Sequence, residues 1–222
     1  MVYSSGVKLS LLLECPTAKG IAACHLTHLT NLLTEHSHGQ YGRDKALEIR
    51  TLAENSIGLN SRSVGFELQQ TIRLIQNLQQ EIFILNKHIK AVMKEIASPI
   101  LTVLGISYTL GAIILAEIGD ITNFQSPAKL LAFAGLEPST YQSGKFTAGN
   151  TPMVKRGSPY LRWAFLNAAR LVSMRDNTFN AYCRKKKAEG KHHNVAMSHV
   201  GKKLVRVVFH LLKTNSSFVP QN

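Results

Sequence analysis

The sequence predicts an all-α protein in which a long coiled-coil helix precedes a compact helical domain. Apolar residues follow a heptad pattern through residues 68–96 and recur at helical spacing in most of the remaining chain. No run of alternating apolar and polar residues is flanked by hairpin turns, which disfavours a sheet. Ser98 and Pro99 interrupt the helical pattern. We therefore expect a helical region of residues 1–97 and a second domain of residues 98–222.

The heptad pattern predicts self-association. Its first (a) and fourth (d) positions are occupied, in chain order, by Leu68, Thr71, Ile75, Leu78, Ile82, Leu85, Ile89, Val92 and Ile96. Isoleucine at a with leucine at d favours two-stranded coiled coils, because these side chains fill the holes of a dimer best. We therefore predict a homo-oligomer formed through this helix. The alternative is a long amphipathic helix that packs against its own domain.

The N-terminal region shows helix signals and little sign of chemistry. Thr17 is predicted to cap a helix that runs to Leu33, and residues 41–55 are predicted to form another. Four histidines in this region have no carboxylate or cysteine at ligand spacing, so no metal site is predicted there: His25, His28, His36 and His38.

The cysteines and the absence of targeting signals predict a cytoplasmic protein. Cys15, Cys24 and Cys183 are odd in number and have no CxxC spacing, which suits free thiols in a reducing compartment. No uncharged apolar stretch has the length of a membrane span, and the N-terminus has no cleavage signature of a signal peptide.

Positive charge is concentrated in the C-terminal third. The formal net charge is +13, and residues 1–144 contain as many acidic as basic residues. Residues 145–222 hold 15 Lys and Arg but only Asp176 and Glu189 as acids. Such a density indicates nucleic-acid binding, because basic side chains release counterions condensed on the phosphates. A solvated basic surface and an anionic membrane surface are the alternatives. The cations predicted to contact phosphate are Arg184, Lys185, Lys186, Lys187, Lys191, Lys202 and Lys203.

Residues 100–120 contain a candidate helix-hairpin-helix turn. Gly105 lies between Leu104 and Ile106, with apolar helical stretches on both sides. In such turns a glycine lets backbone N–H groups approach a DNA phosphate. The residue before the glycine is leucine here, whereas proline is usual, so a purely structural turn is the alternative.

A third pattern joins a Gly/Ser/Thr-rich loop to a helix. Ser143 precedes Gly144 in this loop. Further on, Ser158 is predicted to cap a helix and Pro159 suits the first turn of that helix. Arg162 is expected to stay near the loop.

In this region the chain resembles the C-terminal domain of the insertion sequence 110/116/902 family of bacterial transposases. The resemblance is carried by GIxxxxAxxILAEIGD (105–120), FxSxxKLLAFAGLxP (124–138), YxSG (141–144), KRGSxxLR (155–162) and YxxKKxEGKxxxVA (182–196). Their order and spacing cover most of residues 99–213, and PTAKGIA, HLTHLTNLL, GRDKA and ENSIG extend the likeness towards the N-terminus.

The resemblance implies DNA transposition by recombination, with a serine nucleophile and possible guide RNA. The best match for the serine is Ser143, with Ser139 and Ser158 as runners-up. Lys155, Arg156 and Arg162 are candidates to contact DNA and to stabilise the charge that develops at phosphorus.

The resemblance also implies an N-terminal RNase H-like domain with an acidic metal site, for which we expect no counterpart in these 222 residues. We therefore expect the chain to be incomplete on its own, Mg²⁺ to belong to that other domain, and no cofactor in this chain. The family pattern makes Glu117 and Asp120 structural. A full-length transposase is a candidate partner. The alternatives are a non-catalytic dimerising DNA-binding module and an unrelated helix-hairpin-helix DNA-repair protein.

Overall fold

The computed structural model describes residues 3–58, 60–139, 142–143, 146–147 and 153–220. The predicted all-α class is confirmed: helices form nearly all of the regular structure, and the strands in the described residues are two residues long. The α-helices are α1 (Tyr3–Glu14), α2 (Ala18–Ala23), α3 (Leu26–His36), α4 (Arg43–Glu54), α5 (Arg62–Ile96), α6 (Tyr108–Ile118), α7 (Pro127–Phe133), α8 (Pro159–Arg175), α9 (Asn177–Ala188) and α10 (His193–Thr214). The short elements are the 3₁₀ helices η1 (Pro99–Thr102) and η2 (Ile121–Asn123) and the strands β1 (Gln142–Ser143) and β2 (Phe146–Thr147).

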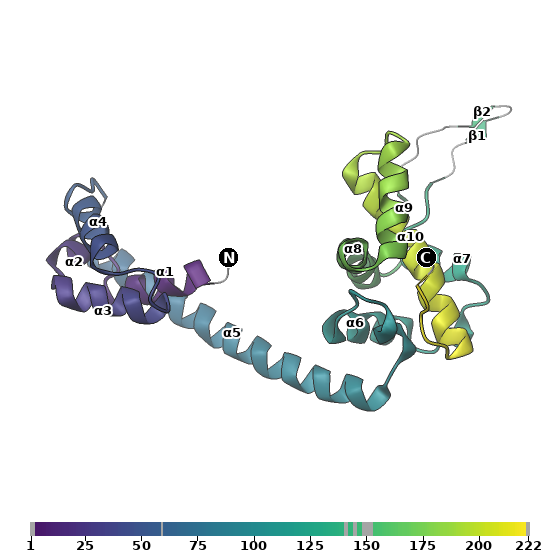
Figure 1. Ribbon diagram of the computed structural model, residues 1–222, viewed down its shortest axis with the longest axis horizontal. Coiled ribbons are helices and arrows are strands. Elements are labelled where there is room, and N and C mark those ends of the chain that lie inside the picture. Colours follow the sequence, from purple (N-terminus) through teal and green to yellow (C-terminus); the bar gives the residue numbers. More distant parts are fainter. Residues whose placement is uncertain (1–2, 59, 140–141, 144–145, 148–152, 221–222) are drawn as a thin grey trace. The chain divides into compact units, whose positions relative to one another are not determined.

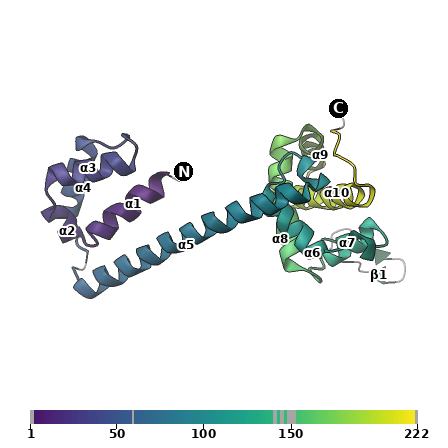
Figure 2. The same cartoon turned by 90° about the horizontal axis from the view of Figure 1, so that it is seen from below.

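Contacts divide the chain into two compact units, Met1–Ile84 and Leu85–Asn222, and the division falls inside α5. The continuous α5 is the longest helix in Figures 1 and 2. It ends at Ile96, as Ser98-Pro99 predicted, and Ala97 turns the chain with a φ of 47°. The domain boundary after residue 97 stays a prediction.

The first unit has a small core built by α1, α3 and α4. Leu29 and Leu33 on α3 are almost completely buried, and Ala46 on α4 packs against them. The helix predicted from Thr17 to Leu33 is wrong in one respect, because it is two helices. Thr17 caps α2 by accepting a hydrogen bond from the Gly20 amide at 3.0 Å, and the chain leaves the helix at Cys24 before α3 begins.

The second unit has the larger core, with α8 and α10 at its centre. Figure 1 shows α8 among α6, α9 and α10, and the contacts of α10 extend to α7, α8 and α9. Phe165, Leu161 and Ala168 of α8 and Val200 and Leu204 of α10 are fully buried. The apolar stripe along α10 therefore forms core, although Val195 near the start of the helix is exposed.

The two ends of α5 contact different segments of the chain. At its N-terminal end Gly65 lies against Pro16, and the Gln69 amide donates to the Leu13 carbonyl at 2.7 Å. At its C-terminal end the Thr109 hydroxyl donates to Asn86 at 2.9 Å, and Met93 is buried beside Gly111.

These contacting residues occupy heptad positions e and b, roughly a quarter turn from the a/d seam. The seam residues between Ile75 and Ile96 are exposed, except for the half-buried Ile89. Each end of α5 therefore packs on its own unit without covering the seam.

Candidate nucleic-acid interface

Two of the quoted motifs, residues 124–138 and 155–162, meet at a backbone junction. Residues 133–138, which begin with the last residue of α7, run antiparallel to residues 153–158, before α8. The Ser158 amide donates to the Phe133 carbonyl at 2.8 Å, and the Val154 amide donates to the Glu137 carbonyl at 3.0 Å. The junction therefore holds together the two ends of the segment that contains Ser143.

The junction leaves no space for a side chain at Gly157. A Cβ atom there would lie 2.0 Å from the Phe133 carbonyl oxygen, and Gly157 has a φ of 95°. Any L-residue would clash with backbone and would also adopt a strained conformation. This explains why glycine follows Lys155-Arg156, which the sequence analysis noted only as part of a motif.

Ser158 caps α8 as predicted. Its Oγ accepts a hydrogen bond from the Leu161 amide at 3.0 Å and donates to Glu117 Oε2 at 2.5 Å. Glu117 therefore ties α6 to the start of α8. Both hydrogen-bonding roles of the Ser158 hydroxyl serve the fold, which weakens this runner-up for a nucleophile.

Three predicted phosphate-binding residues lie at the same start of α8. Lys155 and Arg156 are exposed, and Arg162 is half-buried. Arg162 Nη1 donates to the Lys155 carbonyl at 3.0 Å, as expected for an arginine that stays near the loop. A guanidinium has five N–H donors, so this bond leaves most of them for other acceptors.

Ser143 lies in β1, where its backbone pairs with Phe146 of β2 in an antiparallel hairpin. The sequence predicts only a polar loop here, because strands of two residues are too short to show alternation. The Ser143 side chain and Gly144 lie outside the described residues. Its predicted proximity to Lys155, Arg156 or Arg162 therefore stays a prediction. Ser139, the other runner-up, is half-buried before β1.

Gly105 has a packing role. A Cβ atom would lie 2.7 Å from the Val172 amide nitrogen, and the φ of Gly105 is 113°, so glycine is needed where this turn abuts α8. The element before the turn is the 3₁₀ helix η1 rather than an α-helix. These observations fit the structural alternative, and a phosphate contact at Gly105 stays a prediction.

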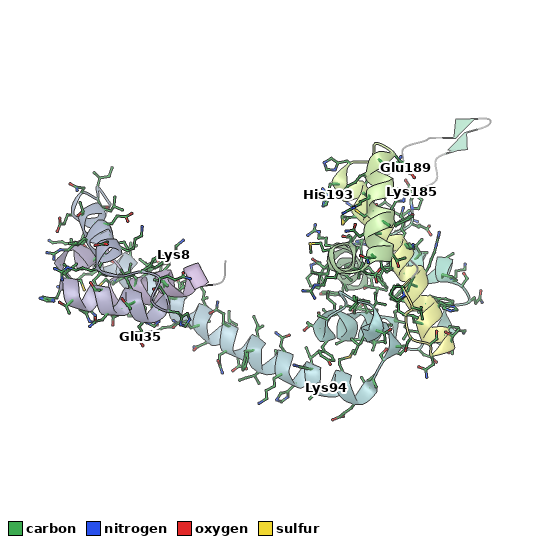
Figure 3. All side chains as sticks on the ribbon, in the orientation of Figure 1. Lys8, Glu35, Lys94, Lys185, Glu189 and His193 are labelled. Atoms are coloured by element: carbon green, nitrogen blue, oxygen red, sulfur yellow. The ribbon has the colours of Figure 1, made fainter. Side chains whose placement is uncertain are left out.

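The basic residues of α9 and α10 fall into two groups. Arg184, Lys185 and Lys187 on α9 and Lys191 after it are exposed. Figure 3 shows Lys185, Glu189 and His193 around the turn between the two helices.

In the second group, Lys186 forms an ion pair with Glu189 at 2.8 Å, which raises the pKa of the lysine. The Lys203 ammonium lies 4.9 Å from the centre of the Tyr182 ring. Burial, followed by repulsion from Arg206, lowers the pKa of Lys202. Lys203 thus joins α10 to the aromatic rings of α9, a packing role that the sequence did not predict.

Among the described residues no group of three or more His, Cys, Asp or Glu side chains is arranged to hold a metal ion. Asp120 accepts a hydrogen bond from the Thr122 amide at 2.8 Å at the start of η2. Hydrogen bonding to the Thr122 side chain, followed by that to its amide, lowers the pKa of Asp120. Glu117 and Asp120 thus both have the structural roles predicted for them. Within the described part of the chain, no helix is long and apolar enough to cross a membrane.

Residues 97–184, which include the junction, match the Transposase IS116/IS110/IS902 family. The match shows that residues 97–184 resemble the transposase domain of this family. It confirms the resemblance inferred from the motifs and removes the alternative of an unrelated DNA-repair protein.

Three relatives from insertion elements agree with this assignment. The 44.8 kDa protein of IS116 from Streptomyces clavuligerus is 29% identical over 191 residues, which are 81% of this chain and 47% of the relative. The 43.6 kDa protein of IS110 from Streptomyces coelicolor is 29% identical over 54% of this chain and 30% of the relative. The 42 kDa protein of IS900 from Mycobacterium paratuberculosis is 33% identical over 56% of this chain and 31% of the relative. The chain thus spans about half the length of the IS116 relative, and its matches cover about a third of the other two relatives.

Proposed function

We propose that the chain acts in DNA transposition as the serine-bearing, DNA-binding part of an insertion-sequence recombinase. The observation that carries this proposal is the family match over residues 97–184, which contains Ser143 and the junction beneath it. DNA is the substrate, guide RNA is a candidate partner, and a separate acidic domain supplies Mg²⁺.

In the proposed reaction the Ser143 Oγ attacks a DNA phosphorus atom. A bond forms between Oγ and phosphorus, and one bridging P–O bond breaks. The serine hydroxyl loses its proton, and the departing deoxyribose oxygen takes up one proton, so the step is balanced. The phosphoserine link keeps the energy of the broken bond for rejoining, which is the reverse attack by a DNA hydroxyl. Lys155, Arg156 and Arg162, at the N-terminal end of α8, favour the negative charge that develops at phosphorus.

The test of the nucleophile is a covalent trap. The chain is mixed with a full-length family relative whose matching serine is replaced by alanine, so that only this chain supplies the hydroxyl. We expect a denaturation-resistant adduct between this chain and a nicked DNA substrate, and its loss in Ser143→Ala with DNA affinity unchanged. Ser139→Ala is the matched control and should keep the adduct. An adduct that persists in Ser143→Ala contradicts the proposed nucleophile.

DNA binding itself is tested by its salt dependence. The logarithm of the affinity should fall with the logarithm of salt concentration by about 0.9 for each phosphate neutralised. Replacing the exposed Arg184, Lys185 and Lys187 by alanine should make this slope shallower by roughly 2 to 3, alike for all DNA sequences. Lys8→Ala, in the other unit, is the control for loss of charge. Affinity that does not depend on salt, or no binding at low salt, contradicts the proposal.

The exposed seam of α5 favours a second candidate function. In this alternative the chain is a non-catalytic module that dimerises through α5 and binds DNA, and it also pairs with a full-length transposase. The supporting observation is that Ile75, Leu78, Ile82 and Leu85 are exposed although they share one face. The covalent trap distinguishes the two functions, because this module forms no adduct.

A further inference from the structure

An apolar groove lies between α6 and α8, beside the Ser158 cap. It has a volume of about 670 Å³ and is lined by Ile113, Ala116, Glu117, Pro159, Tyr160 and Trp163. Two large aromatic side chains in it face solvent, since Tyr160 is 70% and Trp163 is 55% exposed. The groove is not visible in the sequence, because its two walls come from motifs some 40 residues apart.

The chemistry of the groove fits a nucleobase. Exposed aromatic rings provide stacking surfaces that accept any base, because every base has a π-face. The exposed cations Lys155 and Arg156 lie three and two residues before the Ser158 cap of α8, and they offer positive charge to the phosphates of a bound nucleotide. Glu117, the acidic residue of the lining, already accepts from Ser158 and retains acceptor sites for an amino group of a base.

The occupant must be an unpaired base. In duplex DNA both faces of a base are covered by its neighbours, so an aromatic side chain stacks only on a base that is single-stranded or extruded. The junction that begins α8 also holds the ends of the Ser143 segment. An unpaired nucleotide bound at the start of α8 would therefore lie beside the same backbone junction that holds the segment of the proposed nucleophile.

We propose that the groove between α6 and α8 binds one unpaired DNA base, which stacks on Trp163 and Tyr160. This inference rests on the proposed function, because it requires DNA to reach the start of α8. It adds a subsite for single-stranded DNA that is separate from the basic residues of α9.

Trp163 is the single tryptophan of the chain, so its intrinsic fluorescence reports on the groove directly. The wild-type protein is titrated with a single-stranded oligonucleotide, with an abasic oligomer of the same length, and with the corresponding duplex. The abasic oligomer keeps every phosphate and removes every base. We expect strong quenching by the first, and little quenching by the other two at equal occupancy.

Variants measure what the groove contributes to affinity. Trp163→Ala should weaken single-stranded binding by about tenfold, as for the loss of one stacked base, and leave duplex binding unchanged. Trp163→Phe keeps an aromatic ring and should restore most of the affinity. Met174→Ala is the matched control, because Met174 is 69% exposed near the other end of α8. Circular dichroism verifies that each variant remains folded.

Two results would overturn the inference. Equal quenching by the abasic oligomer would show that Trp163 fluorescence responds to binding of the sugar-phosphate backbone and not to a stacked base. A blue shift of the fluorescence that grows with protein concentration, without DNA, would show that a second copy of the chain covers the groove. Salt-dependent duplex binding without base-dependent quenching would refute the groove alone, whereas failure to bind either form of DNA would refute the proposed function as well.

Discussion

The a/d seam of α5 and the apolar stripe of α10 have similar apolar patterns, but the stripe of α10 is buried by other helices and the seam of α5 is exposed. Both helices are long, and both carry apolar residues along one face. Val200, Leu204 and Val208 of α10 are fully buried, and α7, α8 and α9 contact that helix. On α5, Leu78, Ile82 and Leu85 are each more than half exposed.

The difference lies in which positions are apolar. The a/d seam of α5 keeps a spacing of 3.5 residues, which suits a partner helix of the same kind. Its two ends instead contact their units through e residues such as Gly65 and Met93. On α10 the buried positions also include the small residues Ala196 and Gly201. Gly201 lies against Leu166, Ala169 and Phe165 of α8 and so lets the two helices approach closely. An apolar face with small residues thus predicts close packing within the chain.

The largest expected effect comes from truncating matched leucines on the two faces. Leu204→Ala should lower the free energy of unfolding of the second unit by about 2–5 kcal/mol, because Leu204 is fully buried and a cavity would remain. Leu78→Ala should change the stability of the monomer by at most about 0.5 kcal/mol, because Leu78 is 53% exposed. Urea unfolding of dilute protein measures both. A large loss for Leu78→Ala would show that the seam is covered within the chain.

The next prediction concerns association. Ile82→Asp together with Leu85→Asp should convert a dimer to a monomer, because the double variant places charge in the seam of each helix. Sedimentation at concentrations of tens of micromolar measures the change. Phe83→Asp is the control: Phe83 is 66% exposed and lies at position b, outside the seam. If the wild-type chain sediments as a monomer, or if the control dissociates it equally, the seam is not the interface.

Much of this fold was predictable because its signals are local. The helix through Ile96, its end before Pro99 and the Ser158 cap all follow from periodicity and from residues within one or two turns. The break between α2 and α3 was missed, because the chain leaves the helix at Cys24 without a proline or glycine there.

The candidate site was less predictable, because its contacts join distant segments. No local pattern indicates that Glu117 accepts from Ser158, or that Gly157 abuts Phe133. Composition correctly located the positive charge, but it could not separate the exposed Arg184 from Lys203, whose ammonium lies over aromatic rings. That distinction depends on how α9 packs against α10.

The smallest expected effect concerns the pH dependence of stability. It tests whether the lysines around His199, on α10, disfavour protonation of its imidazole. Burial, followed by repulsion from Lys202, Lys186 and Lys191, lowers the pKa of His199 below its usual 6.5. As the pH falls through that usual value, the unfolded chain takes up a proton that the folded chain does not, so the second unit loses stability in acid. The loss is complete once the pH lies below the folded pKa.

His199→Gln should therefore make the stability of the second unit fall less between neutral pH and about pH 5. Lys202→Gln should produce part of the same effect, because it removes the strongest charge repulsion on the imidazole. Lys213→Gln removes a cation from the same helix that does not act on His199, and it should leave the pH dependence as in the wild type. Urea unfolding at several pH values measures the slopes. If the stability of His199→Gln changes with pH as steeply as that of the wild type, the burial and neighbouring lysines of His199 do not disfavour its protonation. The acid sensitivity then arises from another group.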